Sequence, residues 1–462
     1  MKVMKFGGSS MGDGSRIRAV ARIVKRHSSM EPCVVVVSAM HGVTDALAGL
    51  AKSASEGDAA AVQESLKGLR IKHEDAARDS LRSRGRLHRE VDAIESRLTQ
   101  LEGLLTAAMT IGEVPPRVRD RILSFGEVLS SDLLCGALLD AGVKAEGMSG
   151  GEAGIVTDEN FGEASPLPDI TRMKLSARLK PKLDEGVVPV VAGFTGATQH
   201  GDVTTLGRGG SDYSATVLAA SLGADEVWLW SDVDGILTCD PRIVKTAKVL
   251  RRVSYAEAME MVVFGAKNIH PRALEPVARA RIPVRVRNTF KPSDEGTLIF
   301  GEPKESGGVA KCVTVMKDVG LISVNGAGMV GRPGTAAAIF DVVSSAGVNI
   351  VMISQSVSEG GLSLLVRRDA LYRAVTGLEL NLLGKGAVDE VLSEDDVAAV
   401  SVVGAGMRGT PGVAARVFGA VARKGVNVRM IAQGSSELSI SFVVKESEAD
   451  TAVAAMARAF GL

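Results

Sequence analysis

The chain has 462 residues, too many for one ordinary hydrophobic core, so we expect two or three domains. Its 54 basic residues equal its 54 acidic residues, which argues against nucleic acid or an anionic membrane as a partner. No uninterrupted apolar run reaches about 18 residues, as a membrane span would require. The cysteines are far apart and lack CxxC spacing, so we expect a cytoplasmic protein with free thiols at Cys33, Cys135, Cys239 and Cys312.

The first 300 residues alternate strand-like and helix-like segments. Short apolar runs bounded by glycine, proline or charge predict buried strands at 34–38 (VVVVS), 187–192 (VVPVVA), 227–230 (VWLW) and 282–286 (IPVRV). Between these runs, apolar residues recur with helical spacing. The alternation predicts an α/β domain with a mainly parallel central sheet and flanking helices over residues 1–300.

Residues 56–122 differ from their surroundings because they are dense in Arg, Glu and Lys and are punctuated by leucines. This pattern predicts a charged helical pair on the outside of the domain. A nucleic-acid-binding arm is the alternative, but acidic residues are interleaved with the basic ones, which favours a solvated helix face.

The C-terminal third contains an internal repeat. Residues 325–355 align without gaps to residues 403–433, and 17 of the 31 positions are identical. Each copy has the pattern strand, glycine turn, helix, Gly-Val-Asn turn and strand, which predicts two small βαβ-containing modules packed together. The segment 291–308, rich in Gly, Pro and charge, is the expected boundary.

Two glycine-rich loops carry charged residues at predicted strand ends. In KFGGSS (5–10), Lys5 precedes glycines that allow a polyanion to approach the backbone, and a helix is predicted to begin near Ser15. In TLGRGGSDYSA (205–215), Arg208 and Asp212 precede a helix predicted at 214–220. Two such loops suit a site for two anions. The alternatives are an ordinary turn in the first loop and an incidental Arg–Asp pair beside a capped helix in the second.

Neither loop is a known nucleotide fingerprint, because the chain lacks GxxxxGK[ST] and has no GxGxxG after its first strand. Further polar residues are expected at the same edge of the sheet, where open α/β sheets bind ligands. SAMHGVTDAL (38–47) and SFGEVLSSDLL (124–134) supply Ser38, Thr44 and Glu127, although Glu127 alone could be a surface residue. WSDVDGILTCDPR (230–242) resembles the start of a calcium loop, but no glutamate completes it, so no metal site is predicted.

In this order the stretches KFGGSS, SAMHGVTDAL, SFGEVLSSDLL, TLGRGGSDYSA, DVDGILTCDPR and FGAKNIHPRAL resemble the aspartate kinases (aspartokinases) of the amino acid kinase superfamily. The repeat in 321–462 resembles their paired ACT regulatory modules, which are ferredoxin-like (βαββαβ). The resemblance implies a catalytic domain over 1–300 with a helical insertion at about 56–122. It implies ACT modules over 301–395 and 396–462, with 302–318 contributing a strand to the second module.

The resemblance implies a reaction and a pathway. ATP, with Mg²⁺ bridging its phosphates, would phosphorylate the β-carboxylate of L-aspartate to give 4-phospho-L-aspartate and ADP. This is the first step toward lysine, threonine, methionine and isoleucine. A carboxylate with a pKa of about 4 is already ionised at neutral pH and needs no general base, which agrees with the lack of a His or Ser–His pair among the motifs. His270 is accordingly expected to be structural.

The resemblance also implies roles for individual residues. Lys5 would neutralise charge on the transferring phosphoryl group, and Asp212 would orient Lys5. The amides of Gly7, Gly8 and Ser9 would bind that phosphoryl group, and Gly209 and Gly210 would also bind phosphate. The aspartate pocket would have Arg208 on the α-carboxylate, Glu127 on the α-ammonium, and Ser38, Thr44, Phe194 and Ser211 on its walls. The nucleotide would be held by Ser231, Asp232, Arg242 and Lys267, with the aliphatic Leu237 where relatives often have an aromatic residue.

Regulation follows from the same resemblance. The family's effector lies between ACT modules of two subunits, which implies a homodimer or a larger homo-oligomer. Met329, Asn349 and Gln355 are the candidate effector residues. Lysine-sensitive relatives often have an aspartate at the position of Val351, so we favour threonine over lysine as the allosteric amino acid, and an enzyme without an effector is the remaining alternative.

Two other functions are compatible with parts of the sequence. One is an amino-acid-binding regulatory protein whose kinase domain is inactive, but intact Lys5, Glu127, Arg208 and Asp212 argue against it. The other is a related kinase acting on glutamate, N-acetylglutamate or a nucleotide, against which the loop sequences and the ACT pair argue.

Overall fold

The structure is a computed structural model that describes residues 1–263, 269–301, 308–386 and 388–462. It divides into two compact units. The first unit comprises Met1–Ile236, Arg251–Tyr255 and Lys267–Gly301, and the second comprises Leu237–Leu250, Ala256–Ala266 and Glu302–Leu462. The chain therefore passes between the two units several times, whereas the sequence predicts a single boundary near residue 300.

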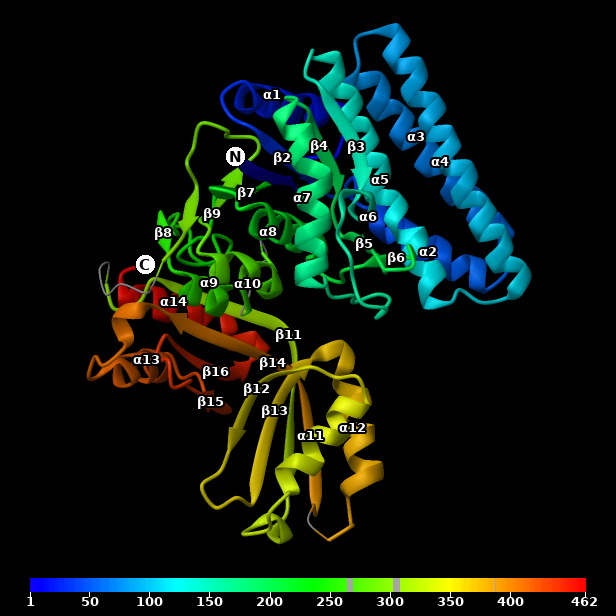
Figure 1. Cartoon of the computed structure of the whole chain (residues 1–462). Helices are drawn as coiled ribbons and strands as arrows, with labels where there is room; N and C mark the ends of the chain where they lie inside the picture. The colour runs from blue at the N-terminus through cyan, green and yellow to red at the C-terminus, as the bar shows by residue number, and fades with distance from the viewer. Residues whose placement is uncertain (264–268, 302–307, 387) are drawn as a thin grey trace. The chain divides into compact units, whose positions relative to one another are not determined.

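The first unit is built on an eight-stranded sheet with the order β3-β4-β2-β1-β7-β9-β10-β8 (Figure 1). Adjacent strands are parallel except for the pair β9 and β10. The four strands predicted from the sequence correspond to β2, β4, β7 and β9, so the mainly parallel sheet is confirmed. The strands are β1 Lys2–Phe6, β2 Cys33–Val37, β3 Ala145–Ser149, β4 Val188–Ala192, β7 Glu226–Ser231, β8 Arg252–Val253, β9 Val284–Asn288 and β10 Thr297–Ile299.

The central strands are apolar along their whole length because both faces of the sheet are covered. All five residues of β2 and all five of β4 are buried. The strands also end at the same level, since Phe6 pairs with Val37 and Trp230, and Val37 pairs with Ala192. The loops that follow β1, β2, β4 and β7 therefore emerge together at one edge of the sheet, as the sequence predicts.

The charged region 56–122 contains two long helices, α3 and α4, and the beginning of α5, which lie side by side in Figure 1.

Within the described residues, α5 is the one helix long and apolar enough to cross a membrane, but 72% of its most apolar stretch is buried inside the protein, as in a core helix. The helices are α1 Gly14–Ser28, α2 Val43–Ser55, α3 Ala59–Ser80, α4 Arg84–Ile111, α5 Pro116–Asp140, α6 Gly150–Ala153, α7 Pro168–Asp184, α8 Gly210–Leu222 and α10 Pro271–Ala280.

The helix predicted at 214–220 is longer than expected, because α8 already begins at Gly210. Two glycines and two small polar residues favour a loop by intrinsic propensity. Gly209, however, has φ of 73°, which lets the chain turn sharply into the helix, and a side chain at Gly210 would lie 2.7 Å from the ring of Phe194. Close packing thus places Ser211 and Asp212 in the first helical turn.

The second unit contains a six-stranded antiparallel sheet with the order β12-β13-β11-β14-β16-β15. Each module has the βαββαβ pattern when the strands β11 and β14 are counted in both modules, so the two ferredoxin-like modules are confirmed. The elements are β11 Cys312–Asn325, α11 Thr335–Ser345, β12 Ile350–Gln355, β13 Gly361–Arg367, α12 Arg368–Leu382, β14 Glu390–Val403, α13 Val413–Ala422, β15 Met430–Ala432, β16 Ser439–Lys445 and α14 Ala449–Phe460.

Two long strands are shared between the modules. The first part of β11, Cys312 to Met316, pairs with Val403 to Ala399 of β14, and the second part, Val319 to Asn325, pairs with β13. The same strand is therefore the last strand of the second module and the first strand of the first module.

Two segments from within the predicted catalytic domain pack in the second unit. Thr238 accepts a backbone hydrogen bond from Val313 at 2.8 Å. Glu257, on helix α9 (Tyr255–Val263), is fully buried, pairs with Lys311 at 2.9 Å and accepts a hydrogen bond from the Ala405 N–H at 2.9 Å. These contacts explain why the chain crosses between the units more than once.

Candidate active site

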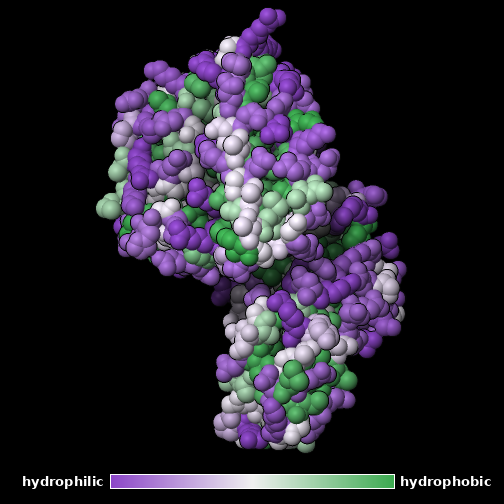
Figure 2. Space-filling view, turned by 90° about the vertical axis from the view of Figure 1, so that its right-hand side faces the viewer, coloured by the Kyte–Doolittle hydropathy of each residue, from purple (hydrophilic) through white to green (hydrophobic). Residues whose placement is uncertain are grey.

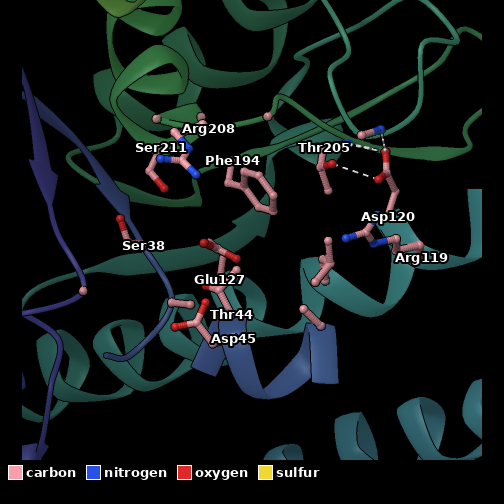
Figure 3. Close-up of a pocket in the computed structure, with 18 of the residues that line it drawn as sticks. Ser38, Thr44, Asp45, Arg119, Asp120, Glu127, Phe194, Thr205, Arg208 and Ser211 are labelled. Carbon is pink, nitrogen blue, oxygen red and sulfur yellow. Dashed lines mark hydrogen bonds between the residues drawn. The ribbon is translucent and has the colours of Figure 1, made fainter. Parts of the chain in front are cut away.

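A cavity of about 870 Å³ opens at the edge of the first unit where the strands end (Figure 3). Its walls come from the loops after β1 and β2, the first turns of α2, the first half of α5 and the loop into α8. The structure brings together here most of the predicted catalytic and substrate residues: Lys5, Gly8, Ser38, Thr44, Glu127, Phe194, Arg208, Gly209, Gly210, Ser211 and Asp212.

Lys5 and Asp212 form an ion pair at the base of this cavity. The distance from Lys5 Nζ to Asp212 Oδ1 is 2.6 Å, and their side chains are 12% and 11% exposed. A nearly buried ammonium group costs desolvation energy unless a carboxylate is beside it. Asp212 therefore holds the Lys5 ammonium in a fixed place, where it faces the cavity.

The loop after β1 is shaped to accept an anion beside Lys5. The N–H groups of Gly8 and Ser9 make no hydrogen bond with the part of the chain that the structure describes. A Cβ on Gly7 would lie only 3.6 Å from Lys5 Nζ, so the glycine keeps the space beside the ammonium open. The predicted use of the Gly7 amide is wrong, because this N–H donates to the Trp230 carbonyl at 3.1 Å and continues the pairing of β1 with β7.

Position 209 requires a glycine for two reasons, its backbone conformation and the close approach of a neighbouring side chain. With φ of 73°, an added Cβ would lie 2.2 Å from the Cβ of His270. His270 itself caps the N-terminus of α10 by accepting the Arg272 N–H through Nδ1 at 3.4 Å. Burial and the nearby Arg272 and Arg208 lower the pKa of His270, which is consistent with the expected structural role.

Two groups in the cavity lack partners of opposite charge. Glu127 is 3% exposed, and its Oε2 makes no hydrogen bond with any described residue. Burial raises the pKa of Glu127 to about 8, although Lys5 and a backbone N–H favour the ionised form. Arg208, on the loop opposite, makes no ion pair within the described residues and points toward the same space as Glu127 in Figure 3. An acidic and a basic group facing one space can bind the ammonium and the carboxylate of one amino acid.

The predicted nucleotide residues are not among those that line the cavity. Ser231 and Asp232 lie at the end of β7, where their carbonyl groups accept hydrogen bonds from the Thr289 N–H at 2.8 Å and from Asn288 Nδ2 at 3.4 Å. Arg242 belongs to the second unit, because the turn after it packs into that unit's core through Ile243 and Val244. The Arg242 side chain is 79% exposed and pairs with Asp240, so its predicted role at the nucleotide finds no support in the geometry. Lys267 lies outside the described residues.

The predicted effector residues do not form one site within a single chain. Met329 is 4% exposed and packs in the core of the first module. Gln355 ends β12 and Asn349 directly precedes the strand; both are exposed, and an extended segment of this length spans ~20 Å. One free amino acid cannot bridge that distance, so any site that uses both residues needs a second surface.

Comparisons with known proteins agree with this architecture. Residues 1–288 match the model of the amino acid kinase family, and residues 322–382 and 400–460 match an ACT domain model. The chain is 36% identical over 471 residues to the aspartokinase of Mycolicibacterium smegmatis, covering all of this chain and 96% of that protein. The chain belongs to the aspartokinases.

Other relatives and solved structures extend the comparison. The chain is 36% identical over 458 residues to the chloroplastic bifunctional aspartokinase/homoserine dehydrogenase 2 of Zea mays, covering 96% of this chain and 49% of that protein. The chain thus spans about half the length of such bifunctional relatives. Crystal structures of E. coli aspartokinase III cover the whole chain: the R-state complex with aspartate and ADP (29% identity, TM-score 0.86) and the T-state complex with lysine and aspartate (30% identity, TM-score 0.80).

Several residues of this aspartokinase cavity were not predicted from the sequence. They are Asp45, Arg119, Asp120, Phe161 and Thr205, all of which line the cavity. A partial signal existed for Asp120, because it precedes Glu127 by seven residues and therefore lies on the same face of α5. Arg119 adjoins Asp120 on the same helix, and Asp45 and Thr205 lie within the motifs 38–47 and 205–215 beside residues that were predicted. Of the five, Phe161 alone comes from a segment without such a motif.

Proposed function

We propose that this aspartokinase transfers the γ-phosphoryl group of ATP to the β-carboxylate of L-aspartate and forms 4-phospho-L-aspartate and ADP. The observation that carries the proposal is the presence in one cavity of the unpaired Glu127 carboxyl, the unpaired Arg208 guanidinium and the Lys5–Asp212 pair. The first two suit the ammonium and α-carboxylate of the substrate. The third places a positive charge where its β-carboxylate would meet a phosphate.

The chemistry needs little from the protein beyond charge and position. The β-carboxylate is ionised at neutral pH, so no residue has to remove a proton from the nucleophile. In phosphoryl transfer the main requirement is to bring the two anions together and to stabilise charge on the transferring oxygens. Lys5 supplies a fixed cation for this purpose, and the free N–H groups of Gly8 and Ser9 supply hydrogen bonds.

The site fits the phosphates of ATP with bound Mg²⁺. The glycine at position 7 leaves room beside the Lys5 ammonium that a side chain would fill, and a Cβ at position 8 would lie 3.0 Å from the Ala39 carbonyl oxygen. Within the described residues, no group of three or more His, Cys, Asp or Glu could hold a metal ion alone. Mg²⁺ in such enzymes is held largely by the phosphates and by one or two carboxylates, and it neutralises charge on them. Ser231 and Asp232 at the end of β7 are the described residues that we assign to the nucleotide.

The proposal includes regulation by an amino acid between two subunits. β12 lies at the edge of the second unit's sheet, so its outer side can pair with another chain. Figure 2 shows hydrophobic residues on the lower part of the visible face, which the first module forms. Exposed large apolar residues of this module are Val330, Ile353, Val357, Tyr372, Leu380, Leu383 and Leu392. A homodimer would cover such residues.

Threonine is the proposed effector, because Val351 supplies no carboxylate for the side chain of lysine. The reaction would then be the first step toward lysine, threonine, methionine and isoleucine. The four free cysteines favour a reducing compartment, and we place the enzyme in the cytoplasm.

The deciding experiment is to incubate the protein with Mg·ATP and L-aspartate and to trap acyl phosphate as the hydroxamate, with and without threonine. Hydroxamate that depends on L-aspartate, and that does not form with L-glutamate, would establish the substrate. Folded protein that forms no product with either amino acid would contradict the proposal and favour an amino-acid-binding regulatory protein.

A further inference from the structure

Asp120 has the environment of a carboxylate that organises the cavity. It is 1% exposed, yet it lines the cavity beside Arg119 and Thr205 (Figure 3). It lies on α5 seven residues before Glu127, which corresponds to about 10 Å along the helix axis. The helix therefore presents two buried carboxyl groups to one space. Glu127 has an unpartnered oxygen, whereas both oxygens of Asp120 are used.

Asp120 accepts three hydrogen bonds from two distant segments. Its Oδ2 accepts the Thr205 N–H at 2.7 Å and the Gly162 N–H at 2.9 Å, and its Oδ1 accepts the Thr205 hydroxyl at 2.8 Å. Burial raises the pKa of Asp120, whereas these three hydrogen bonds and the neighbouring Arg119 favour the ionised form. Hydrogen bonds to a charged group each contribute more than bonds between neutral groups.

These bonds attach α5 to the loop that carries Arg208. Thr205 ends β6 (Val203–Thr205), and Arg208 follows it by three residues. On the other side, the Leu206 N–H donates to the Phe194 carbonyl at 2.9 Å, and the Thr205 carbonyl accepts the Ala164 N–H at 2.9 Å. The Arg208 loop is thus held at its base by Asp120 of α5, while Arg117 of the same helix pairs with Asp202 at the other end of β6.

We propose that Asp120 is a positioning residue that fixes the distance between Arg208 and Glu127 and so sets which amino acid fits between them. The inference rests on the proposed function, because it assumes that these two groups bind the α-carboxylate and the α-ammonium of the substrate. Both Asp120 oxygens already accept hydrogen bonds from the protein. Asp120 acts through Arg208.

The structure offers a conservative replacement for the test. In Asp120→Asn, the amide oxygen can take the place of Oδ2 and accept both N–H groups, while the amide nitrogen donates to the Thr205 hydroxyl oxygen. Asp120→Ala removes all three bonds and leaves the buried Thr205 N–H without its acceptor, as well as the more exposed Gly162 N–H. The exposed Asp169 on α7, with a side chain 89% exposed, provides a matched control in Asp169→Ala.

Steady-state kinetics of these variants test the proposal. We expect Asp120→Ala to raise the KM for L-aspartate at least tenfold while kcat and the KM for ATP stay within about threefold of the wild type. Asp120→Asn should recover most of the loss, and Asp169→Ala should behave as the wild type. Where Asp120→Ala does not fold, Thr205→Val removes the hydroxyl bond alone and should raise the KM several-fold.

A double-mutant cycle separates action through Arg208 from a general structural role. If Asp120 works through Arg208, then adding Asp120→Ala or Thr205→Val to Arg208→Ala should change kcat/KM for L-aspartate less than twofold. Fully additive losses would overturn the proposal, as would an unchanged KM in both single variants. Wild-type protein without aspartate-dependent product would instead contradict the proposed function, so the two failures are distinguishable.

Discussion

The cavity of the first unit gathers its predicted residues at one edge of a sheet, whereas two of the predicted effector residues of the second unit lie apart along an edge strand and the third is in the core. In the first unit, loops after parallel strands that end in register meet at one edge of the sheet. In the second unit, Asn349 directly precedes β12, Gln355 ends it and Met329 is in the core. A parallel sheet gathers its loops within one chain, but an antiparallel edge presents its residues in a row to whatever pairs with it.

The largest effect should come from the charge at the base of the first site. Lys5→Ala should lower kcat about a thousandfold, because it removes the fixed cation that would face the transferring phosphoryl group. Lys52→Ala, at an exposed position on α2, is the control and should leave kcat unchanged. If the site consists of residues from one chain, the fall in kcat should be the same at all protein concentrations. Circular dichroism should show an intact fold, and near-normal turnover would refute the role of Lys5.

A second buried glutamate in the first unit, Glu90 on α4, lies near Asp132 of α5 and should limit stability. Burial, together with the nearby Asp132, raises the pKa of Glu90 to about 7. The folded state then holds a proton that the unfolded state releases above about pH 4.5, so the free energy of unfolding falls by about 3 kcal/mol between pH 4.5 and 7 and then levels off.

Glu90→Gln should remove this contribution and stabilise the protein above pH 7, as urea unfolding at several pH values would show. Glu64→Gln, at an exposed position on α3, should leave the wild-type dependence in place. Equal unfolding curves for wild type and Glu90→Gln at pH 8 would show that Glu90 does not carry this cost.

The glutamate in the cavity should make substrate binding depend on pH. Burial raises the pKa of Glu127 to about 8, and an ammonium group beside it would favour the ionised form. Binding of L-aspartate below pH 8 should therefore release a proton, and the KM should rise by up to tenfold for each unit by which the pH falls. Glu127→Gln should raise the KM at pH 8 and flatten the profile. A wild-type KM independent of pH between 6 and 8 would rule out an ammonium at Glu127.

The smallest predicted effect concerns the second site. Ile353→Lys, on the exposed face of β12 between Asn349 and Gln355, should raise the threonine concentration for half-inhibition about tenfold without changing kcat. Ile431→Lys is the matched control, because Ile431 holds the equivalent position in the second copy and is similarly exposed. Inhibition should also weaken on dilution, unlike the effect of Lys5→Ala. An effect confined to Ile431→Lys would move the effector interface to β15.

The sequence was sufficient for the sheet, the two modules and most of the cavity, because these depend on apolar runs, glycine turns and a visible repeat. An apolar run or a glycine turn lies next to each of the predicted site residues Lys5, Glu127 and Arg208 in the sequence. The use of the Gly7 amide could not be predicted, since it depends on how far the pairing of β1 with β7 continues. Asp120 was missed because its partners lie 42 and 85 residues away.

The position of Arg242 shows a different limit of prediction from the sequence. Its motif follows β7, so its place in the first unit seemed determined by chain order. The turn that contains it instead packs its apolar residues with the core of the second unit, and the charged side chain is left in solvent. A local pattern identifies a motif, but the packing of the apolar residues next to it determines which unit the motif belongs to.

The shared strand β11 has a consequence for how the C-terminal part of the chain can be made and dissected. Residues 396–462 expressed alone would lack the strand that pairs with Ala399 to Val403, and residues 319–395 alone would keep their own four strands but lose the continuation of β11 and β14. The first fragment would therefore expose an unpaired edge to its neighbours and aggregate, while the second could fold. The two ACT modules are therefore similar in sequence but differ in whether they can fold independently.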